Sequence, residues 1–287
     1  MSGSFNLSIV IPVFNEEGVI SEVLQELLQF AQGRDWEIIV VDDGSTDKTA
    51  EKIAFFDVKL IRNLSNKGYG ASLKAGIRQA GADHILIMDG DGQHNPKEID
   101  KLLPYTEDYT LVVGSRNKIF HSVFWRMPGK WLITCLANYL TRQKIPDLNS
   151  GFRIFRKKFI LKYLAICPDR FSFSTTSLIA FLSDGHPVKF IDIEIRKRIG
   201  KSTVTVKTGL ETILLVLRIV ALFNPLRIFI PVSFLLSSTG IFYFLFSYLV
   251  LDRGSISALF MFLIGSLIFF FGLVSDQIAR FRRELTG

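Results

Sequence analysis

Two long runs of apolar residues near the C-terminus constrain the architecture more than any other feature. Ile228–Leu251 contains 24 residues without a charge and would extend about 36 Å as a helix, enough to cross a hydrocarbon core of about 30 Å. Ile256–Val274 adds 19 uncharged residues, about 28 Å as a helix. Only Asp252–Ser255 separates the runs. The pattern predicts a two-helix transmembrane hairpin, with spans over about 228–251 and 256–275.

Basic residues flank this hairpin and predict its orientation. Arg227 precedes the first run, and Arg280, Arg282 and Arg283 follow the second. The positive-inside rule then places both termini and the preceding domain on the cytoplasmic face of an integral membrane protein. The N-terminal residues lack the basic segment and apolar run of a secretory signal.

The formal charge of +7 is concentrated next to the hairpin. Between Arg196 and Arg218 there are six basic residues and one acid, Glu211, which suits a surface facing anionic lipid headgroups. A solvated basic face is the alternative. Because aromatic residues do not alternate with these charges, nucleic acid is not an expected partner. Residues 207–226 are apolar on most of their surface and predict a juxtamembrane amphipathic helix, with a buried core helix as the alternative.

The first half of the chain alternates short apolar runs with amphipathic stretches, the pattern of a mainly parallel α/β sheet covered on both faces. A helix is expected from Val19 to Ala31, and Asn95-Pro96 predicts another helix start. We therefore expect one α/β domain over 1–206, the juxtamembrane helix over 207–226 and the hairpin with a short tail over 227–287. Strands are predicted at Leu7–Val13, Glu37–Val41, Val58–Ile61, His84–Met88 and Leu111–Gly114.

Acidic residues follow three of these strands. Asp89-Gly90-Asp91 comes directly after one strand, Asp42-Asp43 ends another, and Pro12–Glu16 ends the first. Carboxyl ends of parallel strands meet at one edge, where ligands bind in such sheets. Two carboxylates one residue apart can present oxygens to Mg²⁺ or Mn²⁺, which complete their shells with water and substrate phosphates.

Each of these signals also has a plainer interpretation. Most isolated Asp-x-Asp pairs are exposed turn residues, and Asp42-Asp43 is consistent with a helix N-cap that leaves one carboxylate for a ligand. The glycines Gly68 and Gly70 either shape a turn or allow close approach of a ligand. His94 is expected to be a solvent-facing residue at the helix entry, with a metal ligand as the alternative.

The joint pattern resembles glycosyltransferase family 2, and within it the dolichyl-phosphate mannose synthase and polyprenyl-phosphate glucosyltransferase group. The resemblance covers about residues 7–205 and implies a Rossmann-like nucleotide-diphospho-sugar transferase domain of the GT-A type. The motifs that carry it are Pro12–Glu16, Val41–Asp47, Asn66–Gly70, Asp89–Gln93, Gly114–Arg116 and Ser150–Phe152.

The resemblance implies roles for individual residues. Asp89, Asp91 and Gln93 would hold the metal and, with Gly90, the donor diphosphate; Ser150 belongs to a further donor-side motif. Arg198 and Lys201 lie in a basic loop expected to contact that diphosphate. Arg116, Lys130 and Thr134 stand where the family binds the acceptor phosphate, although Lys and Thr replace the more usual Arg and Ser. The nucleoside pocket would be lined by Pro12, Phe14, Glu16, Val41 and Asp43.

The implied reaction is transfer of a hexose from a nucleotide-sugar to a polyisoprenyl phosphate, such as undecaprenyl or dolichyl phosphate. UDP-glucose is the first expected donor and GDP-mannose the second. A phosphate acceptor needs no strong base, so a single displacement with inversion is predicted, in which Asp91, Arg116 and Lys130 take part. The alternatives are a family 2 transferase acting on a hydroxyl lipid or a growing glycan, and a non-catalytic membrane scaffold. A homo-oligomer is possible, because small residues in the hairpin allow close helix approach.

Overall fold

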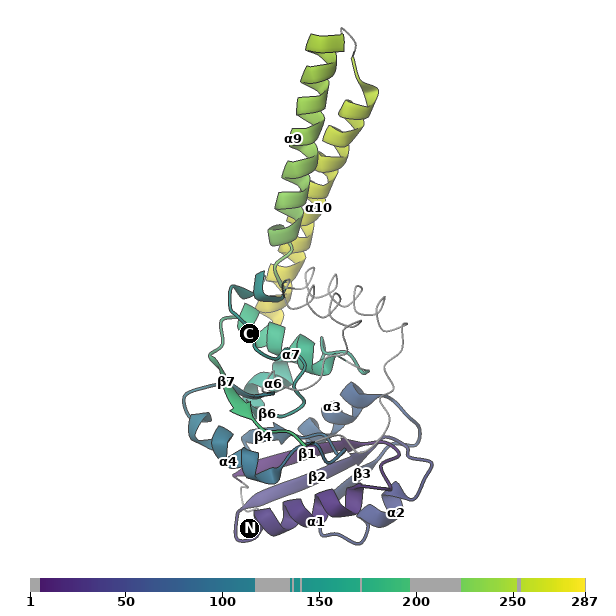
Figure 1. Ribbon diagram of the computed structural model, residues 1–287, viewed down its shortest axis with the longest axis vertical. Coiled ribbons are helices and arrows are strands. Elements are labelled where there is room, and N and C mark those ends of the chain that lie inside the picture. The colour runs from purple at the N-terminus through teal and green to yellow at the C-terminus, as the bar shows by residue number, and fades with distance from the viewer. Residues whose placement is uncertain are drawn as a thin grey trace. The chain divides into compact units, whose positions relative to one another are not determined.

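The computed structural model describes residues 6–116, 135, 137–139, 141–170, 172–196, 223–251 and 254–286. Its contacts divide the chain into two compact units, Met1–Thr208 and Gly209–Gly287, drawn in Figure 1. The two units are described separately below. The domain boundaries expected from the sequence stay a prediction.

The first unit contains a seven-stranded sheet of order β3-β2-β1-β4-β6-β5-β7. The pairs β1–β2, β1–β4, β2–β3 and β5–β7 are parallel, whereas β6 runs antiparallel to β4 and β5. The mainly parallel sheet expected from the sequence is therefore found, with one reversed strand inside it. The strands are β1 Leu7–Val13, β2 Trp36–Asp42, β3 Lys59–Arg62, β4 His84–Ile87, β5 Leu111–Arg116, β6 Arg153–Arg156 and β7 Val188–Ile193.

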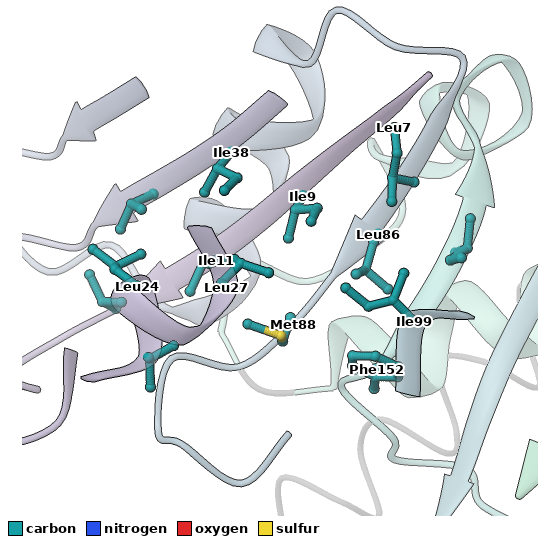
Figure 2. Close-up of a cluster of buried hydrophobic side chains, with 14 of the residues drawn as sticks. Leu7, Ile9, Ile11, Leu24, Leu27, Ile38, Leu86, Met88, Ile99 and Phe152 are labelled. Carbon is teal, nitrogen blue, oxygen red and sulfur yellow. The ribbon is translucent and has the colours of Figure 1, made fainter. Parts of the chain in front are cut away.

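The central strand β1 is buried along its whole length because both faces of the sheet are covered. Ile9 and Ile11 belong to the core cluster that also contains Leu24 and Leu27 of helix α1 (Ile20–Ala31), as Figure 2 shows. Val10, which lies between the two isoleucines, points to the other face of the sheet and packs against Gly76 of helix α3 (Tyr69–Gln79). An uninterrupted apolar run is therefore what this strand requires.

The remaining helices of this unit are short, apart from α7. Asn95 accepts a hydrogen bond from the backbone N–H of Lys97 at 3.0 Å and caps the turn that leads into α4, as its position before a proline predicts. Helix α7 is buried on nearly every side, so its residues are apolar or small. The helices are α2 Thr49–Ile53, α4 Ile99–Leu102, α6 Lys157–Tyr163 and α7 Phe173–Ser183, with short 3-10 turns at Pro96–Glu98 and Leu103–Tyr105.

The second unit is an antiparallel pair of long helices, α9 (Leu226–Leu251) and α10 (Ile256–Thr286). Both helices are long and apolar enough to cross a membrane. Gly240 and Gly265 lie where the helices touch: a side chain at Gly240 would meet the Phe262 backbone nitrogen at 2.8 Å, and one at Gly265 the Ser237 nitrogen at 2.9 Å. These small residues thus serve contacts within the hairpin.

Candidate functional site

Three neighbouring strands end at one edge of the sheet, and polar residues follow each of them. β1 pairs in parallel with both β2 and β4, so Val13, Asp42 and Ile87 lead to the same edge. The Val13 carbonyl accepts the Asp43 N–H at 2.9 Å, which continues the pairing past the strand ends. The structure therefore brings the Pro12–Glu16, Asp42-Asp43 and Asp89–Asp91 segments to one edge, as the sequence predicts.

Asp43 organises the loop after β3 from this edge. Its Oδ1 accepts hydrogen bonds from the Asn63 amide at 2.9 Å and the Lys67 N–H at 3.0 Å, and its Oδ2 accepts the Gly68 N–H at 2.8 Å. The carboxylate is almost fully buried. Since a carboxylate has about four acceptor positions, three of them are used to hold this loop in place.

The adjacent Asp42 has a structural role. It is fully buried, accepts the Ser45 N–H at 3.0 Å and pairs with Arg62 at 3.2 Å. The N-cap position of α2 is Lys48, which makes no side-chain capping bond, and the side chain that reaches the first helical N–H is that of Asp47, whose Oδ1 accepts the Thr49 N–H at 3.0 Å. The interpretation of Asp42-Asp43 as the cap of this helix is thus wrong, because the turn places Asp47 nearer the first helical N–H.

The predicted nucleoside-pocket residues at the end of β1 line the same edge. Pro12 and Val41 are register partners within the sheet, and Val41 is fully buried. Phe14 is 42% exposed. Asn15 has a left-handed backbone with φ 54°, stabilised by its side chain, which accepts the Thr46 N–H at 2.9 Å. The Glu16 N–H donates to the Thr49 hydroxyl at 2.9 Å, which holds the β1 and β2 loops together.

Asp89 is held from two sides after β4. The Tyr69 hydroxyl donates to its Oδ1 at 2.8 Å, and the His94 ring nitrogen lies 3.7 Å from its Oδ2. Burial opposes ionisation, but His94, Tyr69 and Arg116 outweigh it, so the pKa of Asp89 lies below its ordinary value. Burial, followed by the charge of Asp89, raises the pKa of Tyr69 well above its ordinary value.

Glycines on both sides allow this close packing. A side chain at Gly151 would collide with the Asp89 carboxylate, with the Asp89 Cγ only 2.8 Å away. A side chain at Gly90 would meet Val13 Cγ1 at 2.6 Å. A side chain at Gly70 would likewise meet the backbone of residues 168–170, with the Arg170 oxygen 3.0 Å from its Cβ, which favours a packing role over a ligand contact. The Ser150–Phe152 motif therefore packs directly against the Asp89 carboxylate.

Asp91 and Gln93 lie in the turn that follows. The Asp91 carboxylate accepts the Gln93 N–H at 3.2 Å, so the turn presents Asp91 beside the backbone of Gln93. The Gln93 carbonyl accepts the Arg196 N–H at 2.8 Å, and Arg196 forms a bidentate pair with Glu26 at 2.7 and 2.6 Å. The first residue of the predicted basic loop therefore lies alongside the Asp89–Gln93 turn.

His94 does not face solvent, contrary to expectation. It is 7% exposed and stacks on Phe152, with ring centroids 4.9 Å apart. The His94 backbone forms an isolated antiparallel β-bridge with Ile195, which covers His94 on the solvent side. The physical reason is that residues distant in sequence, Phe152 and Ile195, cover the helix entry. His94 therefore supports Asp89, a role that local pattern could not reveal.

Arg116 ends β5 and pairs with a nearby carboxylate. Its Nε and Nη2 donate to Asp147 at 2.6 and 2.9 Å, a bidentate arrangement that raises the pKa of Arg116 and lowers that of Asp147. The guanidinium has further N–H groups besides the two used here. Its side chain is 37% exposed. The phosphate contact implied by the family resemblance stays a prediction.

Arg153 is a further residue near the site that the sequence did not single out. It is fully buried and donates to the carbonyls of Ser150 at 3.0 Å and Ser174 at 2.7 Å. Burial lowers its pKa to about 10 despite the nearby Tyr69, Asp147 and Asp89. Ser150 is itself fully buried, and Arg153 supplies a hydrogen bond to its carbonyl. The only available signal was a charged residue directly following the Ser150–Phe152 motif.

Four predicted site residues, Lys130, Thr134, Arg198 and Lys201, lie outside the described residues, as does the predicted juxtamembrane helix up to residue 222. Within the described ranges, no group of three His, Cys, Asp or Glu side chains is placed to hold a metal ion. The two carboxylates after β4 fit a cation whose shell is completed by substrate phosphates and water, as Mg²⁺ and Mn²⁺ sites often are. The Asp89 carboxylate is also contacted by Tyr69 and His94, which fix its orientation.

Comparison with known proteins agrees with the fold. The family model of glycosyl transferase family 2 matches residues 8–164, more than half of the chain, and the chain belongs to this family. A second family model, the GtrB C-terminal hairpin, matches residues 224–281. The expected fold class, an α/β transferase domain followed by a two-helix hairpin, is confirmed, and the hairpin indicates membrane association.

Curated relatives include enzymes that act on polyprenyl phosphates. The chain is 32% identical over 199 residues to undecaprenyl-phosphate 4-deoxy-4-formamido-L-arabinose transferase of Pectobacterium carotovorum, covering 66% of this chain and 59% of that protein. It is 33% identical over 170 residues to dodecaprenyl-phosphate galacturonate synthase of Rhizobium johnstonii, covering 55% and 49%. The matches thus span only about half to three fifths of these relatives.

A solved structure shows the same fold at low identity. Glucosyl-3-phosphoglycerate synthase of Mycobacterium tuberculosis, crystallised with Mn²⁺, uridine diphosphate and glucosyl-3-phosphoglycerate, superposes with a TM-score of 0.61 at 19% identity. The match covers 76% of this chain and 79% of that one. At this identity the likeness shows the fold and nothing further.

Proposed function

We propose that this protein transfers a sugar from a nucleotide-sugar to a polyisoprenyl phosphate at the cytoplasmic face of a membrane. The observation that carries the proposal is the Asp89-Gly90-Asp91 turn at the sheet edge where Asp43 and Glu16 also lie. The same chain has a hairpin long and apolar enough to cross a membrane. A polyisoprenyl chain stays in the bilayer, so an enzyme that uses its phosphate benefits from a membrane anchor.

In this proposal the residues at the sheet edge bind and orient the donor. Mg²⁺ or Mn²⁺, when bound, would neutralise charge on the departing nucleoside diphosphate, with Asp89, Asp91 and Gln93 as the proposed protein ligands. Tyr69 and His94 keep Asp89 ionised and oriented. Pro12, Phe14, Glu16, Val41 and Asp43 border the nucleoside side of the edge.

The acceptor is proposed to approach from the β5 side. Arg116, held by Asp147, provides a fixed positive charge there, and Lys130 and Thr134 are proposed to complete the phosphate contact. An anionic acceptor needs no general base to lose a proton, so positioning and charge stabilisation are sufficient for one in-line displacement. The proposed product therefore has inverted configuration at the anomeric carbon, which NMR of the glycolipid determines directly. Retained configuration would contradict this mechanism.

A panel of nucleotide-sugars tests which sugar the protein transfers. UDP-glucose is the first proposed donor and GDP-mannose the second. Nucleotide-linked 4-deoxy-4-formamido-arabinose and galacturonate belong in the panel, because relatives are named for transfer of these sugars. The purified protein in lipid vesicles is supplied with undecaprenyl phosphate and each donor, with and without EDTA. Transfer that stops with EDTA and returns with Mg²⁺ or Mn²⁺ supports the proposal.

A matched pair of variants assigns the chemistry to the site. Asp91→Asn is expected to lower the transfer rate at least about 100-fold, because charge stabilisation of this kind contributes several kcal/mol. Asp57→Asn removes an equivalent charge from an exposed position and should leave the rate unchanged. Transfer to a hydroxyl lipid, with none to any lipid phosphate, would instead favour a glycolipid synthase.

A further inference from the structure

Asn149 is an exposed residue in the loop that joins two parts of the site. Asp147, two residues earlier, holds Arg116 through a bidentate pair. Gly151, two residues later, lies against the Asp89 carboxylate. Since consecutive Cα atoms are about 3.8 Å apart, the Asn149 Cα lies within about 7.6 Å of the Cα atoms of both Asp147 and Gly151. Asn149 is therefore placed between the carboxylate that holds Arg116 and the glycine that packs on Asp89.

Helix α7 sets the orientation of the Asn149 side-chain amide. The Thr175 hydroxyl donates to the Asn149 Oδ1 at 2.6 Å, and Thr175 is almost fully buried. The Asn149 backbone N–H donates to Asp147 Oδ1 at 3.1 Å, which fixes the turn that carries the side chain. An amide has its oxygen on one side and its NH2 group on the other, so this contact leaves Nδ2 on the exposed side. Among the described residues, none accepts a hydrogen bond from this Nδ2.

Three charged groups border the region next to this loop. The pKa of Arg116 is raised first by its hydrogen bond to Asp147. The charges of Asp89 and Asp91 raise it further, so both carboxylates lie close enough to act on the guanidinium. Arg116 and the two carboxylates after β4 therefore face one region, next to the loop that carries Asn149.

An in-line displacement requires the sugar to lie in this region. In the proposed reaction the acceptor phosphate approaches from Arg116, and the nucleoside diphosphate leaves on the side of Asp89 and Asp91. The anomeric carbon has to lie between the attacking oxygen and the leaving oxygen, so the sugar ring occupies the space between these groups. An N–H donor on the adjoining loop is then within reach of oxygen atoms on the ring.

We propose that Asn149 binds the donor sugar and contributes to its selection. Its Nδ2 donates a hydrogen bond to an oxygen of one ring substituent, a hydroxyl or a carboxylate, while Thr175 holds the amide in the orientation that makes this donor available. A sugar without an oxygen at that place leaves the donor unpaired, which disfavours its binding. The inference rests on the proposed function and deepens it, because it assigns a residue to sugar recognition apart from the metal and nucleoside residues.

Asn149→Asp separates sugar binding from a purely structural role in the turn. The carboxylate has nearly the same shape and still accepts the Thr175 hydroxyl, but it has no N–H to donate. The full-length protein in lipid vesicles is supplied with undecaprenyl phosphate, Mg²⁺ and the nucleotide-sugar that the panel selects, UDP-glucose being tested first. We expect the KM for this donor to rise at least about tenfold. A donor KM equal to that of the wild type would overturn the proposal.

The nucleoside diphosphate without its sugar controls for the added charge. Isothermal titration calorimetry measures the binding of UDP and of UDP-glucose, or of the corresponding pair for the selected donor. Between wild type and Asn149→Asp, UDP affinity should change less than about twofold, whereas UDP-glucose should bind about tenfold more weakly to the variant. Equal weakening of both ligands would show charge repulsion and overturn the proposal. Gln79→Glu adds the same charge at an exposed position of α3 and should match the wild type.

Thr175→Val tests the orientation of the amide without any change of charge. Valine keeps the shape of threonine but loses the hydroxyl, so the Asn149 amide is free to turn. The donor KM should rise about threefold, less than in Asn149→Asp. An unchanged donor KM would overturn the role assigned to Thr175.

Analogues of the selected donor, each lacking one oxygen-bearing substituent, locate the contacted atom. The analogue that lacks the partner of Asn149 should bind the wild type about tenfold more weakly than the complete donor, and Asn149→Asp should bind it as well as the wild type does. An equal difference between wild type and variant for every analogue would overturn a direct contact. Circular dichroism and gel filtration confirm that the variants fold.

The two proposals fail in different ways. If the Asn149 inference fails, Asn149→Asp transfers sugar with the wild-type donor KM. If the transfer proposal fails, no sugar reaches undecaprenyl phosphate, yet the nucleotide-sugar still binds more weakly to Asn149→Asp while the nucleoside diphosphate binds equally. Absence of binding by every nucleotide-sugar of the panel would overturn both.

Discussion

Helices α7 and α9 are both rich in apolar residues, but they bury these residues in different ways. In α7, Leu178 and Phe181 are fully buried inside the sheet-containing unit. In α9, Phe234 is 73% exposed and Leu249 is 76% exposed. Because the hydrophobic effect acts only on surface removed from water, α7 stabilises the fold by contacts with protein, whereas α9 needs a bilayer to cover its side chains. Similar composition therefore has different energetic consequences.

The largest expected effect tests this difference directly. Phe181 packs on Phe155 and Tyr163 with ring centroids 5.6 and 5.1 Å apart, so Phe181→Ala leaves a cavity and should cost about 3–5 kcal/mol of unfolding free energy. Phe234→Ala should cost under about 0.5 kcal/mol in micelles, since its ring has few protein neighbours to lose. Thermal unfolding followed by near-ultraviolet circular dichroism compares the two. Equal losses would contradict the distinction.

The next largest effect separates catalysis from anchoring. Gly151→Ala places a methyl group against the Asp89 carboxylate, so it should displace that carboxylate and lower sugar transfer about 100-fold, equivalent to about 2.7 kcal/mol. Gly254→Ala, in the hairpin turn, has open space around it and should transfer at the wild-type rate. Initial rates at saturating substrates measure both. A normal rate for Gly151→Ala would show that the Asp89 position is not required.

Substitution of a glycine in the hairpin should have the opposite effect to Gly151→Ala: it should lower stability and leave sugar transfer almost unchanged. Gly265→Leu would meet Ser237 and Ser233 backbone atoms within 3.0 Å, which should separate α9 from α10 and cost about 1–3 kcal/mol. Ile264→Leu, at a neighbouring exposed position, is the control. Thermal loss of helical circular dichroism measures the effect, while transfer at saturating acceptor should change less than about twofold, an effect within about 0.4 kcal/mol. An unchanged melting curve would contradict the close contact.

The smallest effect concerns pH. The folded pKa of Asp89 is below its ordinary value, so its ionisation contributes stability above pH of about 3.9, and this contribution is lost as pH falls through the folded pKa. Tyr69→Phe removes a hydrogen bond to the carboxylate, raises the pKa of Asp89 and should move the acid limb of the transfer rate to higher pH. The rate near neutrality should fall about tenfold, equivalent to about 1.4 kcal/mol.

Tyr248→Phe serves as the control for this experiment, because Tyr248 is exposed on α9 and stacks on Phe244. Its pH profile should match that of the wild type. If the acid limb of Tyr69→Phe also matches the wild type, the Tyr69 hydroxyl does not influence Asp89 as the structure indicates.

Strand prediction succeeded where the signal was local and continuous. Leu7–Val13 was predicted with the bounds that β1 has, because a strand buried on both faces is an uninterrupted apolar run. The strands β6 and β7 were not placed. β7 is only partly buried along most of its length, and β6 begins with a buried arginine, Arg153. Neither pattern distinguishes a strand from a loop when read by itself.

In the functional site, too, local sequence signals predicted some features and only the fold revealed others. The carboxyl-end positions of Asp43, Asp89 and Asp91 followed from strand order and motif spacing. The burial of His94 against Phe152 depends on a segment 58 residues later in the chain, and local pattern favoured exposure instead. Tyr69 was part of a recognised motif, yet its bond to Asp89 required α3, which packs on β1 and β2, to bring Tyr69 next to the turn after β4.

The sequence by itself determined the membrane hairpin and the acidic edge of a parallel sheet. Both depend on features repeated along a continuous segment: 24 uncharged residues in one case, and turns at successive strand ends in the other. Only the tertiary structure decided that Asp147 holds Arg116, that Tyr69 and His94 hold Asp89, and that Arg153 is buried beneath the site. Such pairs form between segments distant in sequence, so their geometry exists only once the chain has folded.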